Sequence, residues 1–329
     1  MPTKSRQVHL ATRPDGLPKH DDFKIVDTVL PDIADGQVLV KQLYMSVDPY
    51  MRPRLSNDFE LNQVMPGGAI GRVVQSRNAN FAEGDVVNNL QGFREYAVSN
   101  GMDIRKLAPQ PGVPLSAYMS VLGATGFIAY GGLLEIGKLK DGEQVFVSTA
   151  AGAVGSVAAQ IAKIKGCYVI GSTGSDDKAA WLREIGLDAV INYKKTPIQD
   201  ALKAAAPRGI DVYFDNVGGD HLDAALACMN SLGRVAVCGM ISGYNEPGTR
   251  TAVRNLSNII YGRINLRGFV VMDFVHLREQ FTRDMSEWLK SGKIKWKDTV
   301  LNGIEQAPHA MVGLMRGENT GKMLVKLSD

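Results

Sequence analysis

A strand, a turn, a helix and a second strand follow one another between Asp141 and Lys178, and this order constrains the fold more than any other stretch. The run Glu143–Thr149 is apolar and β-branched, which predicts a buried strand. Val157–Lys165 is apolar, and its side chains are small enough for a helix packed tightly on a sheet. Gly166 predicts the end of that helix, and the apolar run Cys167–Ile170 predicts the second strand. This order is that of a parallel βαβ unit.

The turn of this unit, Ala150-Ala151-Gly152-Ala153-Val154-Gly155, predicts a binding site for the pyrophosphate of a dinucleotide. N–H groups at a helix start hold phosphates, and the helix dipole favours their negative charge. Gly152 lets the backbone approach the phosphates, and Gly155 lets the helix lie close to the strand. Ala150 takes the place of the usual first glycine. Close packing alone could explain such a set, but the flanking strands and helix favour binding by Gly152, Ala153, Val154 and Gly155.

The residues after the second strand favour NADP over NAD. An NAD site usually has an acid about 20 residues further on, where it binds the ribose 2′-OH. Ser172 stands at that distance from Gly152, and Lys178 follows shortly after it. A small neutral donor with a nearby cation suits a 2′-phosphate. We interpret Asp176 and Asp177 as capping and first-turn charges of the next helix. Lys178 could likewise be only a solvated helix residue.

Length and composition narrow the class of protein. A chain of 329 residues predicts two domains, and 45% hydrophobic residues are ample for their cores. With 37 basic and 34 acidic residues the net charge is only +3, so nucleic acid is not an evident partner. No apolar run predicts a membrane span, and the first residues lack the apolar region of a signal peptide. Three widely spaced cysteines fit a reduced, cytoplasmic protein.

The pattern of elements divides the chain into domains. Residues 1–122 consist of short β-branched runs separated by Gly, Pro and Asp, which predicts an all-β, partly barrel-like domain. Residues 123–292 alternate strand and helix, which predicts six parallel strands. The expected N-terminal strands are 6–11, 23–29, 37–43, 69–75 and 85–87. In the second domain we expect further strands at 189–193, 210–216, 233–239 and 264–271, and helices at 176–185, 198–206, 221–229, 252–261 and 274–289.

The tail, residues 293–329, predicts a strand, a short helix over Ala307–Met315 and a final strand, Lys322–Lys326. We expect it to return to the first domain. The fold class is therefore α/β: a doubly wound parallel sheet of the Rossmann type together with a β-rich domain.

Four segments carry a resemblance to a known family. They are Ser46–Arg52, Ala150–Cys167, Asp215–Gly219 and Cys238–Asn245. With them the chain resembles, over essentially all of its residues, the medium-chain dehydrogenase/reductase superfamily, and within it the zinc-free, NADP-dependent double-bond reductases such as the prostaglandin, plant alkenal and bacterial curcumin reductases. The resemblance implies a GroES-like, partly open barrel as the first domain. It also implies reduction of the C=C bond of α,β-unsaturated aldehydes or ketones by NADPH.

The resemblance also implies the cofactor contacts. Lys178 and Tyr193 would meet the adenosine 2′-phosphate, and Asn216 would begin a ligand-binding loop after its strand. The remaining implied contacts are Cys238, Ile241, Ser242 and Tyr244 in the next loop, Phe269, Val270 and Val271 beside the nicotinamide, and Asn319 from the tail. Relatives often have Gly-Met-Thr/Pro-Gly where this chain has Gly123-Ala124-Thr125-Gly126, which puts the substrate preference in doubt.

The sequence lacks the residues of a catalytic zinc site, so we predict no metal. Zinc in such enzymes needs Cys and His ligands. None of the three cysteines lies in the first domain, and its histidines are His9 and His20, both near the start. Where zinc-dependent relatives carry Gly-His-Glu, this chain has Gly67-Gly68-Ala69-Ile70-Gly71.

Two tyrosines are the candidate catalytic residues. Hydride addition to an enone moves negative charge to the carbonyl oxygen, where a hydrogen-bond donor must stabilise it. By resemblance Tyr261 is the better candidate, and Tyr50 lies in the loop that faces the cofactor in the family. The ribose 2′-OH could serve instead, and Tyr261 could simply be a helix-end residue packed on the sheet.

The sequence leaves two other functions open, and it also predicts an oligomeric state. The chain could be an NADPH quinone reductase, which needs no protonation at carbon, or a non-catalytic, nucleotide-regulated binding protein. The predicted sixth strand, Ile264–Val271, is β-branched and would be an exposed edge, so we also predict a homodimer.

Overall fold

The structure is a computed structural model, and it describes residues 2–245 and 252–329. The chain forms two compact units. The N-terminal unit comprises Met1–Met119, Asp298–Asn319 and Met323–Asp329, and the central unit comprises Ser120–Lys297 and Thr320–Lys322.

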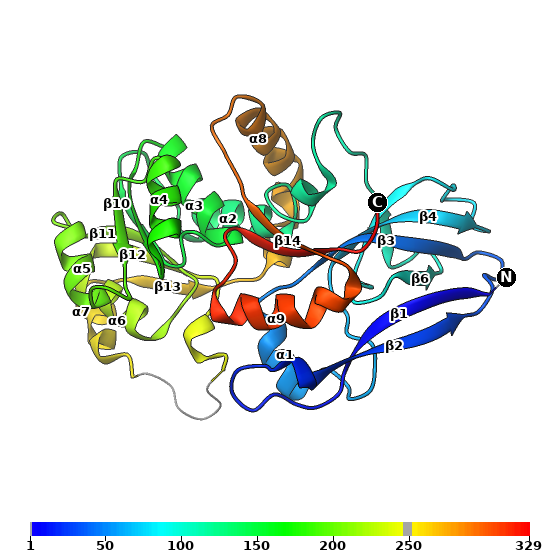
Figure 1. Cartoon of the computed structure of the whole chain (residues 1–329). Coiled ribbons are helices and arrows are strands. Elements are labelled where there is room, and N and C mark those ends of the chain that lie inside the picture. The colour runs from blue at the N-terminus through cyan, green and yellow to red at the C-terminus, as the bar shows by residue number, and fades with distance from the viewer. Residues whose placement is uncertain (1, 246–251) are drawn as a thin grey trace. The chain divides into compact units, whose positions relative to one another are not determined.

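The central unit is built on a parallel sheet (Figure 1). Its six strands lie in the order β10-β9-β8-β11-β12-β13, and every pairing is parallel. The predicted six-stranded parallel sheet is therefore confirmed. The strands are β8 (Gln144–Val147), β9 (Tyr168–Thr173), β10 (Ala189–Asn192), β11 (Ile210–Asp215), β12 (Met229–Val237) and β13 (Asn265–Gly268).

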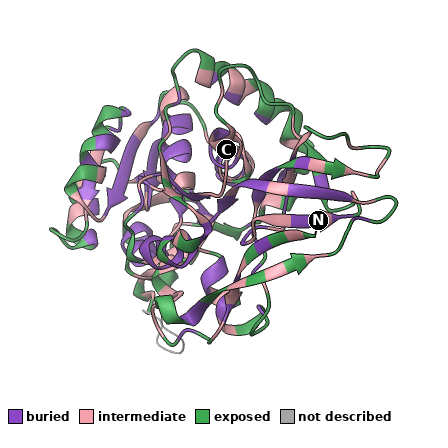
Figure 2. Ribbon diagram, turned by 45° about the vertical axis from the view of Figure 1, so that its right-hand side comes forward, coloured by how far each residue is buried: buried purple, intermediate pink, exposed green. Residues whose placement is uncertain are grey.

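Helices cover both faces of this sheet, which explains why its central strands are buried almost throughout (Figure 2). One layer contains α2 (Ala124–Gly131), α3 (Ala153–Ile164) and α4 (Asp176–Glu184), and the other contains α5 (Ile198–Ala205), α6 (Gly219–Cys228) and α7 (Asn258–Tyr261). The sheet changes winding direction between β8 and β11, and ligands of such sheets bind beyond the carboxyl ends of the strands at that point.

The sixth strand is shorter than the predicted Ile264–Val271. β13 ends at Gly268, and all four of its residues are exposed. The chain leaves the sheet because Phe269 is buried in an aromatic cluster, with its ring centroid 6.0 Å from that of Phe214 and 5.5 Å from that of Phe274.

Two predicted helices also need correction. Where one helix was expected over 252–261, a 3-10 turn, Arg254–Ser257, precedes the four-residue α7. The helix expected over 274–289 begins only at Arg278, because the 3-10 segment Val271–Leu277 carries Phe274 into the core first, and α8 then runs over Arg278–Lys290.

The N-terminal unit is antiparallel where its strand pairs are described. β1 (Thr3–Leu10) and β2 (Phe23–Leu30) form a two-stranded sheet, and a second sheet has the order β14-β15-β3-β4-β5-β7 with β6 added to β3. Two short strands were missed, β6 (Tyr96–Ser99) and β7 (Ile104–Lys106). The other strands are β3 (Val38–Ser46), β4 (Ala69–Ser76), β5 (Val86–Asn89), β14 (Asp298–Asn302) and β15 (Lys322–Lys326).

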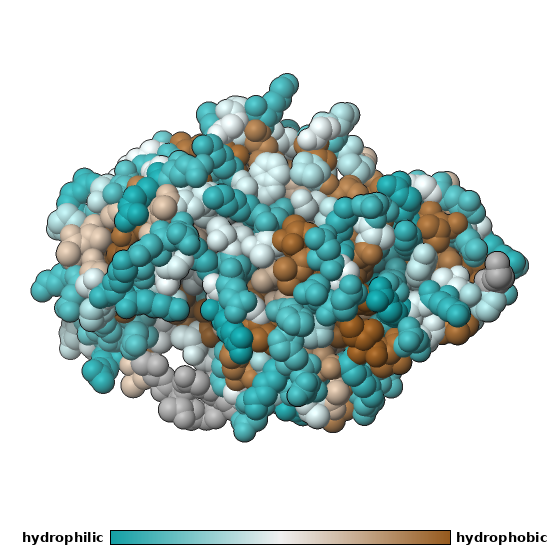
Figure 3. Space-filling view, viewed as in Figure 1, coloured by the Kyte–Doolittle hydropathy of each residue, from teal (hydrophilic) through white to brown (hydrophobic). Residues whose placement is uncertain are grey.

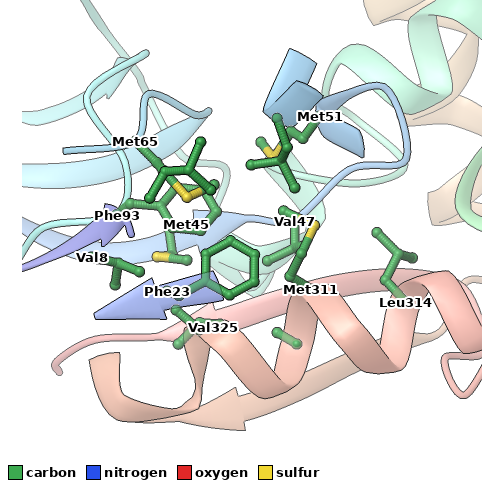
Figure 4. Packing of buried hydrophobic residues seen from close by; sticks show 14 of the residues in the cluster. Val8, Phe23, Met45, Val47, Met51, Met65, Phe93, Met311, Leu314 and Val325 are labelled. Carbon is green, nitrogen blue, oxygen red and sulfur yellow. The ribbon is translucent and has the colours of Figure 1, made fainter. Parts of the chain in front are cut away.

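The tail supplies part of the core of the N-terminal unit. β15 pairs with β3, with Val325 opposite Met45. α9 (Ala307–Arg316) contributes Met311 and Leu314 to the apolar cluster that also contains Phe23 and Met51 (Figure 4). Removing the tail would therefore expose the apolar core of a unit whose other strands lie within residues 3–106.

On the face of the molecule shown in Figure 3, hydrophobic side chains gather only in small groups among hydrophilic ones. None of the helices within residues 2–245 and 252–329 has the length and apolar character needed to cross a membrane.

A neutral histidine is buried on the α6 side of the sheet. His221 is 6% exposed, and its Nε2 has no hydrogen-bond partner among the described residues. Its ring is nearly parallel to that of Phe146 at 6.4 Å and meets the ring of Tyr193 edge-on at 5.0 Å. Burial lowers the pKa of His221 to about 4.

His221 should make the protein lose stability in mild acid. Between its folded-state pKa of about 4 and its ordinary value of 6.5, the unfolded chain binds a proton that the folded chain does not. The free energy of unfolding should therefore fall as the pH falls through this window, by up to about 3 kcal/mol. In urea titrations at pH 7, 5 and 4, His221→Leu should make the free energy of unfolding depend less on pH. His276→Leu, at an exposed histidine, is the control and should leave that pH dependence in place. An unchanged slope in His221→Leu would contradict the assignment.

Candidate functional site

The glycine-containing turn joins the end of β8 to the start of α3. Gly152 is the N-cap of α3, with φ −79° and ψ 175°. A Cβ at Gly155 would lie 2.3 Å from the Thr149 carbonyl oxygen, so only glycine lets the helix lie this close to the strand end. At Gly152 the nearest atoms would be 3.2 Å away, so packing within the chain demands glycine less strongly there.

The turn contains a strained residue. Thr149 has φ +49°, although β-branched residues rarely adopt a left-handed conformation. Its carbonyl accepts the N–H of Gly152 at 3.0 Å. Such outliers persist where the surroundings over-determine them, and they cluster at ligand sites. The N–H groups of the first turn of α3, Ala153–Gly155, have no acceptor within the helix, so this end of the helix can hold an anion.

A second anion-binding feature lies where β9 and β10 end. The ring of Tyr193 lies against Gly174, because a Cβ there would be 2.9 Å from the tyrosine Oη and 3.3 Å from Lys194 Cε. Burial, and then the positive charge of Lys194, lower the pKa of Lys178. Lys178, in the first turn of α4, and Lys194, just after β10, are thus two neighbouring cations. Sequence reasoning missed Lys194, whose only signal was its place beside Tyr193.

The first acid of α4 (Asp176–Glu184) is engaged by other side chains. Ser175 is the N-cap of α4, and its hydroxyl accepts the N–H of Lys178. The Asp176 carboxylate accepts from Lys195 at 2.6 Å and from Asn192 at 2.9 Å. Asp176 and Asp177 lie in the first turn, as interpreted, but the expectation that they cap the helix is wrong, because Ser175 is the N-cap. Ser172, predicted to meet the ribose phosphate, is fully buried within β9, and its Oγ has no hydrogen-bond partner among the described residues.

A buried polar network fixes the loop after β11. Asp215 Oδ1 accepts from the Tyr213 hydroxyl at 2.6 Å, from Val217 N at 2.9 Å and from Gly218 N at 2.8 Å. Ser148, at the end of β8, accepts the N–H of Asn216 on its hydroxyl at 2.9 Å and the Asn216 side-chain amide on its carbonyl at 2.7 Å. Burial raises the pKa of Asp215 despite these donors.

The structure brings the loop after β12 onto this loop. Ile241 N donates to Asn216 O at 3.3 Å, and the Ser242 hydroxyl donates to Val217 O at 2.6 Å. Tyr244 Oη accepts from Met240 N, and the Cys238 N–H donates to Asp215 O at 2.8 Å. Burial and the nearby Asp215 raise the pKa of the Cys238 thiol to about 12. Asn216, Cys238, Ile241, Ser242 and Tyr244 therefore lie together beyond adjacent strand ends.

The residues predicted beside the nicotinamide have different surroundings. Phe269 is buried in the aromatic cluster, Val270 is 59% exposed, and Val271 begins the 3-10 segment. Tyr261 ends α7 with 81% of its surface exposed, so the interpretation that it packs on the sheet is wrong.

Two predicted site residues belong to the N-terminal unit. Tyr50 precedes α1 (Met51–Asn57) and is 46% exposed. Desolvation, and then the negative charge of Asp48, raise the pKa of its hydroxyl to about 12. Asn319 is buried, and it directly precedes the three tail residues that belong to the central unit.

The described residues contain no group of three or more His, Cys, Asp and Glu side chains placed to hold a metal ion. Cys167, Cys228 and Cys238 are free thiols.

Comparison with known proteins gives the family. Residues 6–107 match the family described as the N-terminal domain of oxidoreductase, and residues 153–291 match the zinc-binding dehydrogenase family. Prostaglandin reductase 1 of Bos taurus is 43% identical over 94% of this chain and 95% of its own length. The NADP⁺-dependent 2-alkenal reductase of Nicotiana tabacum is 40% identical over 98% of each chain. The crystal structure of CurA from Vibrio vulnificus in complex with NADPH has a TM-score of 0.93 at 37% identity and covers 98% of this chain and 99% of that one.

The chain belongs to the double-bond reductases of the medium-chain dehydrogenase/reductase superfamily. The family assignment and the α/β fold expected from the sequence are thereby confirmed. For this reductase, the βαβ turn, the paired lysines and the two adjoining loops form one candidate dinucleotide site along the carboxyl edge of the sheet.

The paired lysines should make the reductase prefer a dinucleotide with a 2′-phosphate. Lys178→Ala or Lys194→Ala should weaken NADPH binding by about 1–3 kcal/mol, the scale of a charge-assisted hydrogen bond, and should change NADH binding little. Fluorescence titration of both cofactors measures this. Lys165→Ala, at the far end of α3, is the matched control and should change neither affinity. Equal affinity of the unmodified protein for NADPH and NADH would contradict the assignment.

Proposed function

We propose that this protein reduces the carbon–carbon double bond of α,β-unsaturated aldehydes and ketones with NADPH. The observation that supports this most is the identity of 40% or more, over nearly the whole chain, to a 2-alkenal reductase and a prostaglandin reductase. The cofactor is NADP(H), in agreement with the lysine pair at the ends of β9 and β10 and with the NADPH-bound relative.

The chain's own residues hold the cofactor in place. NADPH supplies the hydride when it is bound. The first turn of α3 and the residues Gly152–Gly155 bind the pyrophosphate, and Lys178, Tyr193 and Lys194 bind the 2′-phosphate. The loops that carry Asn216 and Ile241–Tyr244 line the nicotinamide side, where the Asp215 network keeps them rigid.

The reaction then needs one hydrogen-bond donor at the substrate carbonyl. Addition of hydride at the β-carbon places negative charge on that oxygen, and the α-carbon takes up a proton. Tyr50 is the first candidate, because by resemblance its loop faces the cofactor and its hydroxyl is partly exposed. Tyr261 is the second; its hydroxyl is exposed, but it ends α7 four residues before parallel strand β13 begins, at the edge of the sheet opposite to the cofactor loops.

No metal is needed for this reaction, because an activated alkene delocalises the charge onto an oxygen that a hydroxyl can stabilise. In the described parts of the chain, His, Cys, Asp and Glu side chains do not form a group of three or more that could hold a metal ion. Zinc independence is therefore part of the proposal.

A substrate panel tests the proposed function. An enal, an enone, a quinone and a secondary alcohol should be offered with NADPH or NADP⁺, and the alkenes with NADH as well. NADPH should reduce the enal and the enone, and prolonged chelation should leave this activity intact. Turnover of quinones without enals would favour a quinone reductase. Zinc-dependent oxidation of the alcohol would refute both the alkenal reductase and the quinone reductase. Nucleotide binding without turnover of any substrate would favour a non-catalytic binding protein.

Tyr50→Phe and Tyr261→Phe test the two candidate donors. A hydrogen bond that strengthens as charge develops stabilises the transition state more than the bound substrate, so kcat should fall more than KM rises. The expected fall is on the order of 10²-fold, and less if the ribose hydroxyl substitutes. Tyr168→Phe, at the amino end of β9, is the matched control. A large loss confined to Tyr50→Phe is the expected result. A large loss confined to Tyr261→Phe would assign the role to Tyr261, and a normal kcat in both variants would leave it to the ribose hydroxyl.

We also propose that the reductase is a cytoplasmic homodimer. Free thiols suit a reducing compartment, and β13 ends the sheet as an edge with Leu266 38% exposed. Light scattering at micromolar concentration should give twice the chain mass, and Leu266→Lys should shift the mass toward the monomer because edge charges oppose strand pairing. A monomer in the unmodified protein would contradict this.

A further inference from the structure

A residue from the far end of the chain holds the middle of the glycine-containing turn. The Gly321 N–H donates to the Ala151 carbonyl at 2.8 Å, and Gly152 and Gly321 form an isolated parallel bridge. The N–H of the same Ala151–Gly152 peptide, on Gly152, donates to Thr149 O at 3.0 Å. Because a trans peptide is planar and its N–H and C=O point in opposite directions, the Ala151–Gly152 peptide is fixed at both ends.

Gly321 fits this place only as a glycine. Its φ is +67°, and a Cβ would lie 1.8 Å from the carbonyl oxygen of Lys297 and 2.6 Å from its carbonyl carbon. The neighbouring Lys322 N–H donates to that same oxygen at 3.1 Å. The segment Thr320–Lys322, which belongs to the central unit, is thus held between Lys297 and the turn.

Lys297 is itself anchored to the helices behind the turn. Gln160 of α3 is 2% exposed and exchanges two hydrogen bonds of 2.8 Å with the backbone of Lys295. The Lys297 ammonium lies 5.2 Å from the ring centroid of Trp181 in α4. A continuous set of contacts therefore runs from α3 through residues 295–297 and Gly321 back to the turn that begins α3.

We infer that Gly321 is a positioning residue for the pyrophosphate site. Its N–H occupies the Ala151 carbonyl, which therefore cannot turn toward the phosphates and repel them. The role is needed because glycine at 152 gives this peptide little resistance to rotation. The inference rests on the proposed use of NADP(H), and Gly321 acts through the turn without touching the cofactor.

Gly321→Ala tests the inference. It should weaken NADPH binding roughly tenfold or more, since one backbone hydrogen bond and the turn geometry are lost. Adenosine 2′-monophosphate, which has the 2′-phosphate but no pyrophosphate, should inhibit as well as before, and KM for NADPH should rise more than kcat falls. Gly292→Ala is the matched control, because Gly292 has φ +70° but nothing within 4 Å of its Cβ position, and it should keep both affinities.

Hydrogen exchange on the unmodified protein gives a second measurement should Gly321→Ala fail to fold. By reciprocal linkage, NADPH should slow exchange in the peptide that contains Gly321 as well as in the turn. Protection of the turn alone would overturn the inference, as would unchanged NADPH affinity in a folded Gly321→Ala protein or a parallel loss of both ligands. Failure of the unmodified protein to bind NADPH would instead refute the proposed function.

Discussion

The close approach of α3 to the end of β8 is the constraint on which the site depends. With 2.3 Å between a hypothetical Gly155 Cβ and the Thr149 carbonyl oxygen, any side chain at 155 would push the helix away. At the strand end itself, Thr149 adopts a left-handed conformation. As a result, the N–H groups that start α3 emerge at the carboxyl edge of the sheet, where the ends of β9, β11 and β12 add their loops.

Charge and protonation follow from that arrangement. The positive end of α3 and the pair Lys178 and Lys194 make the edge suited to phosphates at two separate points. Between β8 and β11, the buried Asp215 holds the Asn216 loop through backbone donors. Under the proposed function, binding energy from the phosphates can be used to place the nicotinamide against loops that are already held by hydrogen bonds.

Local patterns predicted most of this fold, whereas contacts between distant segments were harder to predict. The βαβ unit could be read because strand, glycine turn and helix are adjacent in sequence. β6 and β7 were missed because these short strands depend on pairing with β3 and β5 and have little pattern of their own. Phe269 looked like a strand residue, but Phe214 and Phe274 draw it into the core. Lys194 could not be recognised from the sequence, because it comes near Lys178 only through the pairing of β10 with β9. No sequence pattern reveals the hydrogen bond from Gly321 to the turn.

The most direct test of the proposed reaction follows the hydride into the product. An enone should be reduced with NADPH that carries two deuterium atoms at the nicotinamide C4, so that the result does not depend on which face donates. Conjugate reduction predicts a saturated ketone with one deuterium at the β-carbon and a solvent-derived hydrogen at the α-carbon. An allylic alcohol with deuterium at the former carbonyl carbon would contradict the proposed reaction.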